Sequence, residues 1–282
     1  MIINKEEGII VLILKNCTKS FKKTKALNDF SCEFKHGIYG LLGPNGSGKT
    51  TMMRCICGLL SPEKGSIECD CENIGYLPQQ FGAMKSLTVY ETMRYFATLK
   101  KIPKSNQDNE IRYCIDLVNL SDKIKNKVGS LSGGMVRRLG IAQAIMGNPD
   151  IVLLDEPTAG LDPEERVRFK SLLRKIKNDK TIIISTHIVS DVKSICDEIV
   201  IINEGRNVVQ GTCSDITSIG NEKVFLLDEE YENNLEGNYY VKDRISKNNK
   251  NYIIVLSSNF IEQGVSINAD IEDGYLCALK DI

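Results

Sequence analysis

The sequence predicts an α/β fold with a parallel sheet at its centre, and three features of the chain carry that prediction. Short apolar runs alternate with turn residues or helical patterns, which is typical of buried strands joined by helices. A glycine-rich loop follows one of these runs, and an acidic pair follows another. The runs lie at residues 9–14, 38–42, 151–154, 181–185 and 198–202.

One long stretch breaks the alternation of strands and helices. Residues 86–147 have a mostly helical pattern, with Thr88 to Lys100 and Asp108 to Leu120 as the clearer segments. We therefore expect a helical subdomain at about 82–147, inserted in a main domain that spans residues 1–211.

The character of the chain changes again after Gly211. Strand-like stretches are joined there by turns rich in Asn, Asp and Lys. We expect a small α+β accessory domain over residues 212–282. Its predicted strands are Lys223–Leu227, Tyr239–Val241 and Tyr252–Ser257.

Composition excludes some classes of function. The 282 residues carry a formal net charge of −1, so nothing indicates a nucleic-acid partner, which a strongly basic chain would suggest. The apolar run from Ile9 to Leu14 is far shorter than the ~20 residues that span a bilayer. We therefore expect a cytosolic chain.

Ten cysteines are many for such a protein, and two pairs share one spacing: Cys55 with Cys57, and Cys69 with Cys71. A metal or cluster site is one interpretation, but the spacings fit neither of the usual zinc patterns. Free, partly buried thiols in a reducing compartment are the favoured interpretation.

A phosphate-binding loop is the clearest motif. Residues 43–50 match the pattern G-x-x-x-x-G-K-[ST], in which glycines let backbone amides approach phosphate oxygens. Lys49 is placed to reach the β and γ phosphates, and the Thr50 hydroxyl is placed to bind Mg²⁺. The flanking strand and helix patterns make an ordinary glycine-rich turn a weak alternative. The predicted nucleotide-binding residues of the loop are Gly43, Asn45, Gly46, Gly48, Lys49, Thr50 and Thr51.

Two carboxylates follow the apolar run at 151–154. Asp155, at the strand end, is placed to hold Mg²⁺, directly or through water. Glu156 is placed to orient or deprotonate the attacking water. The alternative is a strand followed by an acidic helix cap, which Pro157 and Thr158 would suit. That alternative does not explain the phosphate loop upstream.

A third motif, LSGGM at residues 131–135, opens a helix with small residues that suit backbone amides facing an anion. The chain already has a complete phosphate loop at residues 43–50. This second helix start would therefore contact a phosphate group other than the one that the loop holds. The order of the three motifs resembles the ATP-binding subunits of ABC transporters, and the similarity covers residues 10–211. The resemblance implies an ABC cassette of the P-loop NTPase fold, with a parallel-sheet core, antiparallel β elements and a helical insertion.

The resemblance implies roles for three further residues. Phe21 matches the aromatic that stacks on adenine, and His187 matches the switch histidine at the γ-phosphate. Gln79 matches the glutamine that senses Mg²⁺ and links the nucleotide state to the membrane partner; the adjacent Gln80 is the other candidate for this position. The plainer alternatives are a packed aromatic, a lone histidine at the ligand-bearing edge of the sheet, and an ordinary loop amide.

The resemblance also implies a head-to-tail pair of copies that sandwiches two ATP molecules. Ser132, Gly133 and Gly134 then contact the ATP held by the other copy, and Asp162 lies in the loop that crosses between the copies. Met135 stands where the family most often has glutamine. We expect a working site, because the hydroxyl and the two glycine amides remain. ATP closes the pair, and Mg²⁺-dependent hydrolysis reopens it.

The expected partner is a separate integral membrane permease subunit, which would hold this chain at the cytoplasmic face of the cell membrane. In the family, the surface between Gln79 and about Thr98 docks the partner's short cytosolic helices. Residues 271–279 look like the closing helix of the C-terminal extension in subunits of exporters, which indicates export. The apolar candidates for docking are Phe81, Met84, Leu87, Val89 and Tyr90, each of which suits core packing equally well.

Two other functions compete with transport. A soluble ABC-type ATPase without a membrane partner, such as a cluster-assembly ATPase, is the stronger alternative because of the cysteines. A nucleotide-gated binding module would lack the catalytic carboxylate or histidine, yet Glu156 and His187 are both present. For residues 212–282, a structural lid on the sheet domain is favoured over a regulatory or dimer-contacting module.

Overall fold

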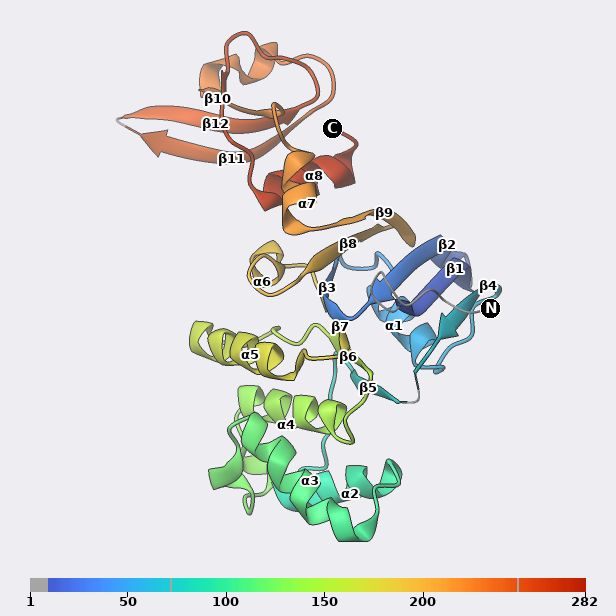
Figure 1. The fold of residues 1–282 in the computed structure, drawn as a ribbon. Helices are drawn as coiled ribbons and strands as arrows, with labels where there is room; N and C mark the ends of the chain where they lie inside the picture. Colours follow the sequence, from blue (N-terminus) through green and yellow to red (C-terminus); the bar gives the residue numbers. More distant parts are fainter. Residues whose placement is uncertain (1–9, 72, 248) are drawn as a thin grey trace.

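The computed structural model describes residues 10–71, 73–247 and 249–282 and has a six-stranded sheet at its centre (Figure 1). β5, β6, β7, β3 and β8 run parallel in that order, and β9 lies antiparallel to β8 at the edge. The predicted parallel core is therefore confirmed. The strands are β3 (Gly37–Leu42), β5 (Ile74–Leu77), β6 (Ile151–Asp155), β7 (Thr181–Thr186), β8 (Glu198–Asn203) and β9 (Arg206–Gly211).

A second sheet has three antiparallel strands in the order β2-β1-β4. The sequence grouped the apolar run at 9–14 with the parallel strands, and that grouping is wrong: the run lies in β1, apart from residue 9, which falls outside the described residues. Only Lys22 and Lys23 join β1 to β2, and so short a turn joins antiparallel strands alone. The strands are β1 (Ile10–Phe21), β2 (Thr24–Lys35) and β4 (Lys64–Cys69).

Three helices follow the carboxyl ends of strands in the central sheet. α1 (Lys49–Ile56) follows β3, α5 (Pro163–Ile176) follows β6, and α6 (Val189–Val192) follows β7. Fully buried side chains from β2, α1 and β6, among them Phe30, Met52 and Leu153, form one apolar core. This core fixes α1 and the antiparallel sheet against one face of the central sheet.

The predicted helical insertion forms the end of the molecule below the sheet in Figure 1. α2 (Val89–Leu99) and α3 (Lys104–Leu117) occupy the two stretches predicted as helix, and α4 (Gly133–Ile145) follows. Thr88 begins α2 in a capping box with Glu91. One apolar core joins all three helices to the sheet. The 3₁₀ turns Ser121–Lys123 and Val128–Ser130 connect α3 to α4.

The C-terminal part lies at the opposite end of the molecule, with sheet order β11-β12-β10-β13. The three predicted strands and the predicted closing helix are confirmed. α8 lies between two apolar cores: Tyr275 packs with β8 of the central sheet, and Cys277 packs with the C-terminal sheet. The elements are α7 (Cys213–Ser218), β10 (Val224–Asp228), a 3₁₀ helix (Glu229–Asn234), β11 (Tyr239–Lys247), β12 (Lys250–Ser257), β13 (Val265–Ser266) and α8 (Ile271–Lys280).

The cysteines correct one expectation. Cys69 and Cys71 form a disulfide, so the prediction of free thiols is wrong for that pair. The two Cα atoms are 5.4 Å apart, within the usual reach of a disulfide. Cys55 and Cys57 are free. Over the described ranges, no three His, Cys, Asp or Glu side chains gather into a metal-binding group.

Candidate nucleotide-binding site

The phosphate loop connects β3 to α1 and passes through positions where only glycine fits. A Cβ on Gly43 would lie 2.2 Å from the carbonyl oxygen of Ile202, and one on Gly48 would lie 2.3 Å from that of Ala26. Gly48 also has a φ of +114°, which L side chains rarely adopt. At these two positions the loop passes directly against β8 and β2. α1 then begins at Lys49.

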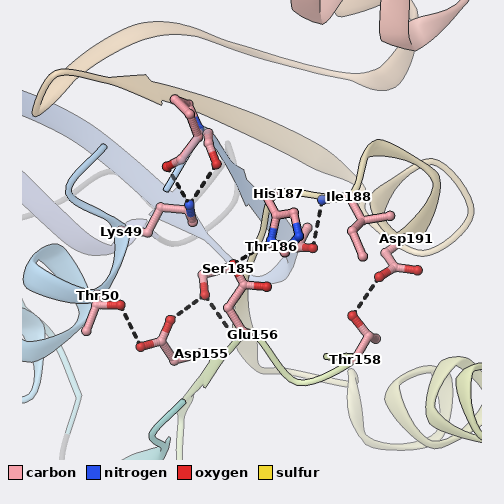
Figure 2. A network of polar contacts seen from close by, with 12 residues as sticks. Lys49, Thr50, Asp155, Glu156, Thr158, Ser185, Thr186, His187, Ile188 and Asp191 are labelled. Atoms are coloured by element: carbon pink, nitrogen blue, oxygen red, sulfur yellow. Dashed lines mark hydrogen bonds and ion pairs between the residues drawn. The ribbon is translucent and has the colours of Figure 1, made fainter. Parts of the chain in front are cut away.

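The Lys49 ammonium closes the loop on itself. Its Nζ donates to the carbonyl oxygens of Gly43 at 2.7 Å and Pro44 at 2.9 Å (Figure 2). Burial lowers the pKa of Lys49, and the nearby charges of Glu156 and Asp155 oppose that shift. The two carboxylates thus help to keep a cation at the position where phosphate would bind.

Asp155 occupies the end of β6 and is fully buried. One carboxylate oxygen accepts a hydrogen bond from the Thr50 hydroxyl at 2.8 Å, and the other accepts one from the Ser185 hydroxyl at 2.5 Å (Figure 2). The structure thus unites the two residues predicted to hold Mg²⁺. Sequence reasoning missed Ser185. This residue lies on the neighbouring strand β7, in register with Asp155, and that pairing is visible only in the structure.

Glu156 is the next residue, and its backbone is left-handed, with a φ of 49°. Its amide donates to the Ser185 hydroxyl at 2.9 Å. Oε1 lies 3.1 Å from Nδ1 of His187, whereas Oε2 is buried with no hydrogen-bond partner. The acceptor Oε2 is therefore available to a group that enters the site.

A hollow of 260 Å³ lies over these side chains. Gln79 lines it together with Thr50 of the phosphate loop, so an amide group and a hydroxyl reach the same hollow, whereas the buried Asp155 is joined to it through its hydrogen bond with Thr50. Hard oxygen donors of this kind suit Mg²⁺. The described residues that line it are Ala26, Asn45, Gly46, Gly48, Lys49, Thr50, Thr51, Gln79 and Glu156. Sequence reasoning did not single out Ala26.

Phe21 does not line this hollow. It lies at the end of β1, its side chain is 46% exposed, and the Lys19 ammonium lies 6.0 Å from its ring centroid. An exposed ring is free to stack on a flat ligand, and the plainer alternative of a packed core aromatic does not apply to it.

Ser132, Gly133 and Gly134 also lie outside the hollow. Ser132 caps α4, and its hydroxyl accepts a hydrogen bond from the Met135 amide at 3.2 Å. The Met135 side chain packs against the apolar core of the helical subdomain. Asp162 likewise caps α5, accepting from the amide of Glu165 at 2.8 Å. Within one chain, these four predicted residues do not meet the phosphate loop.

A network beside Asp155 and Glu156 was not predicted. The Thr158 hydroxyl donates to Asp191 at 2.6 Å, and Arg166 pairs with the same carboxylate at 3.1 Å (Figure 2 shows the first contact). Asp191 belongs to α6, directly after His187. The segment after Glu156 is therefore tied to the segment after His187.

Comparison with known proteins points to one family. The family model described as "ABC transporter" matches residues 27–159. An uncharacterized ABC transporter ATP-binding protein of Bacillus subtilis, YxlF, is 31% identical, with 92% of this chain and 90% of the relative covered. The Nod factor export ATP-binding protein I of Burkholderia lata is 35% identical over 70% of this chain and 69% of its own length.

Solved structures show the same fold. The dimeric structure of MJ0796, a bacterial ABC transporter cassette, superposes with a TM-score of 0.66 at 26% identity, covering 71% of this chain and 98% of that one. A post-hydrolysis state of that cassette, bound to ADP and phosphate, gives a TM-score of 0.65 at 26% identity with the same coverage.

The fold and the site define an ATP-hydrolysing cassette with a phosphate loop, a carboxylate pair and a histidine at one sheet edge. The chain belongs to the ATP-binding proteins of the ABC transporter family, and it is an ATPase.

Proposed function

We propose that this chain is the motor of an exporter: two copies close around ATP and drive a separate membrane subunit. The observation that carries the proposal is the separation of two phosphate-binding elements in one chain. The hollow contains Lys49 and Glu156, whereas the helix start at Ser132 lies outside it. A second copy packed head to tail would bring the partner subunit's Ser132 to this hollow, and the two-fold axis would complete both sites.

The residues in and around the hollow then have roles in hydrolysis. Lys49 and the loop amides hold the phosphates of ATP, and the exposed Phe21 stacks on the adenine. Glu156 takes a proton from the attacking water through the unpartnered Oε2, and His187 holds Oε1 so that the carboxylate cannot turn away. Thr50, Asp155 and Gln79 would hold Mg²⁺, which supplies charge stabilisation for the transferred phosphoryl group.

The membrane partner is supported by the surface that follows Gln79. Over the described ranges, no helix is both long enough and apolar enough to cross a bilayer. Of the five docking candidates, Val89 is fully buried and belongs to the core, Phe81, Leu87 and Tyr90 are half-buried, and Met84 is exposed. Tyr95 and Leu99 add a further exposed apolar stripe along α2. We propose Met84, Tyr95 and Leu99 as the contacts with the permease, at the cytoplasmic face of the membrane.

Export is supported by the named role of one relative, the Nod factor export protein. The C-terminal part gives less direct support, because its closing helix α8 looks like the helix that ends the C-terminal extension of exporter subunits. We propose that residues 212–282 form a structural lid, because α8 fills the space between the C-terminal sheet and β8.

The test is purification of the tagged chain from detergent-solubilised membranes. We expect an integral membrane protein to co-purify, and Tyr95→Glu to weaken the complex, whereas Val265→Glu, at an even more exposed apolar site in the C-terminal sheet, leaves it intact. If the chain stays soluble and without a membrane partner, the alternative of a soluble ABC-type ATPase replaces the proposal.

A further inference from the structure

The side chain of Arg137 makes an unusually complete set of hydrogen bonds beneath the nucleotide site. A guanidinium has five N–H donors, and each one here faces a backbone carbonyl. Nε donates to Pro157 at 3.2 Å, and Nη1 donates to Pro78 at 3.1 Å and Gln79 at 2.8 Å. Nη2 donates to Glu156 at 2.5 Å and also to Asp155.

These carbonyls come from two separate segments that both reach the hollow. Pro78 and Gln79 follow β5, whereas Asp155, Glu156 and Pro157 lie at and after the end of β6. Arg137 itself lies on α4, little more than one helical turn after Ser132. One half-buried cation therefore links three elements with proposed roles in hydrolysis: the Gln79 segment, the catalytic carboxylate and the helix that begins at Ser132.

The contact with Glu156 bears on its backbone. A left-handed conformation is unfavourable for a residue with a side chain and persists only where the surroundings impose it. Here the amide of Glu156 is held by Ser185, and its carbonyl oxygen is held by Arg137. Because the peptide groups before and after the Glu156 Cα are both held, the carboxylate is directed toward His187 and the hollow.

The charge of Arg137 is costly to bury, which argues against a packing role alone. Burial lowers its pKa, and the neighbouring charges of Asp155 and Glu156 partly offset that shift. Among the described residues no carboxylate forms an ion pair with it, so the cation is retained for contacts with carbonyls. A neutral side chain would fill the same space without the cost of desolvation.

We propose that Arg137 is a positioning residue for ATP hydrolysis: it holds the Glu156 and Gln79 peptides in one geometry, so that the Glu156 carboxylate meets the attacking water. The proposal rests on the catalytic role of Glu156 given above. Because Arg137 moves with α4, any shift of the Ser132 helix would reach both segments through the same side chain.

The test compares Arg137→Lys with Arg138→Lys in the full-length protein. Arg138 is the next residue on α4 and also donates to carbonyls, but these are the carbonyls of Val118 and Asn119 just after α3, and its charge pairs with Glu165 of α5 at 3.0 Å. Lys has three donors and cannot span five carbonyls. We expect Arg137→Lys to lower kcat by about 10- to 100-fold, as small misplacements of catalytic groups do, with KM for ATP changed less than about threefold. Arg138→Lys should keep both near wild type.

A second variant guards against a folding defect. Arg137→Gln carries no charge to bury, retains two donors and should show the same selective loss of kcat, with thermal unfolding and ATP binding close to those of Arg138→Lys. If either well-folded Arg137 variant keeps wild-type kcat, the positioning role is wrong. Equal losses of kcat and of ATP affinity would indicate a structural role only, and would also overturn it.

A double mutant separates this inference from the role of Glu156. If Arg137 acts through Glu156, adding Arg137→Lys to Glu156→Gln should reduce single-turnover hydrolysis by less than about twofold, because effects through one group are not additive. The full Arg137→Lys loss in that background would overturn the inference while leaving the Glu156 role intact. Near-normal turnover in Glu156→Gln alone would instead remove the proposed catalytic role.

Discussion

Glu156 and His187 face each other across the ends of two neighbouring strands, with Oε1 of the glutamate 3.1 Å from Nδ1 of the histidine (Figure 2). The contact uses only one carboxylate oxygen, and the second is buried with no hydrogen-bond partner. This division of the carboxylate, one oxygen held and one available, is the arrangement that a general base needs.

Glu156→Gln should lower steady-state ATPase by at least ~100-fold, the low end for losing a catalytic proton acceptor, while ATP still drives dimerisation. Phosphate release and light scattering measure the two effects separately. Glu164→Gln is the matched control, because Glu164 is an exposed acid on α5 whose ion pair, over the described part of the chain, is with Arg168 alone. Near-normal turnover in Glu156→Gln would contradict its role.

Ser132→Arg should abolish ATPase without preventing ATP binding by an isolated monomer. Mixing it with Glu156→Gln should then restore activity, because a mixed pair contains one site with both residues intact. Random pairing makes half of the dimers mixed, so we expect roughly a quarter of wild-type activity, measured in an equimolar mixture. If the mixture is as inactive as its two components, the shared site is wrong.

Removal of Mg²⁺ should stop hydrolysis, and Asp155→Asn should raise the Mg²⁺ concentration needed for half-maximal activity by more than ~10-fold. The reason is that Asp155 and Thr50 are already joined at 2.8 Å, as a donor pair for one ion. Titration with Mg²⁺ in a metal-buffered assay measures the change. Asp122→Asn, which removes an exposed carboxylate beside Lys123, should leave the titration unchanged.

Lys100 should make the stability of the protein depend on pH above neutrality. Burial lowers its pKa from 10.5 to about 8, so the folded state binds the proton more weakly than the unfolded state. Below about pH 8 both states are protonated, and the cost of burying the charge is fully present. As pH rises from about 8 to 10.5, the folded state is neutralised first, and the free energy of unfolding increases.

Urea unfolding at pH 7 and pH 9.5 tests this dependence, with Lys100→Met as the reference for all other titrating groups. The wild type should gain more stability over this interval than the variant. Equal gains in the two proteins would show that Lys100 is not buried as a charge between α2 and the end of α4.

Much of the site was predictable because its motifs act locally. The phosphate loop needs glycine at positions where the backbone passes close to neighbouring strands, and Lys49 and Thr50 follow from the turn into α1. Asp155 and Glu156 follow because a buried strand ends there. For these residues, spacing along the chain determines spacing in the structure.

Other contacts depend on pairings between distant segments. Ser185 reaches Asp155 through the register of β7 against β6, and Arg137 reaches Gln79 and Glu156 only because α4 packs beneath the ends of β5 and β6. No local pattern marks either residue. The position of Val89 also depends on packing. An apolar residue at the start of a helix can lie on the surface or in the core, and Val89 lies in the core.

The sequence by itself determined that the chain binds and hydrolyses ATP. The phosphate loop, the two carboxylates and the histidine occur along the chain in the order typical of ATP-hydrolysing cassettes. Tertiary structure decided that β1 pairs antiparallel, that Cys69 and Cys71 join, and that the Ser132 helix starts away from the hollow of its own chain. The physical reason is range: backbone geometry and residue chemistry act over a few residues, whereas strand pairing, burial and helix packing bring together segments far apart in the chain.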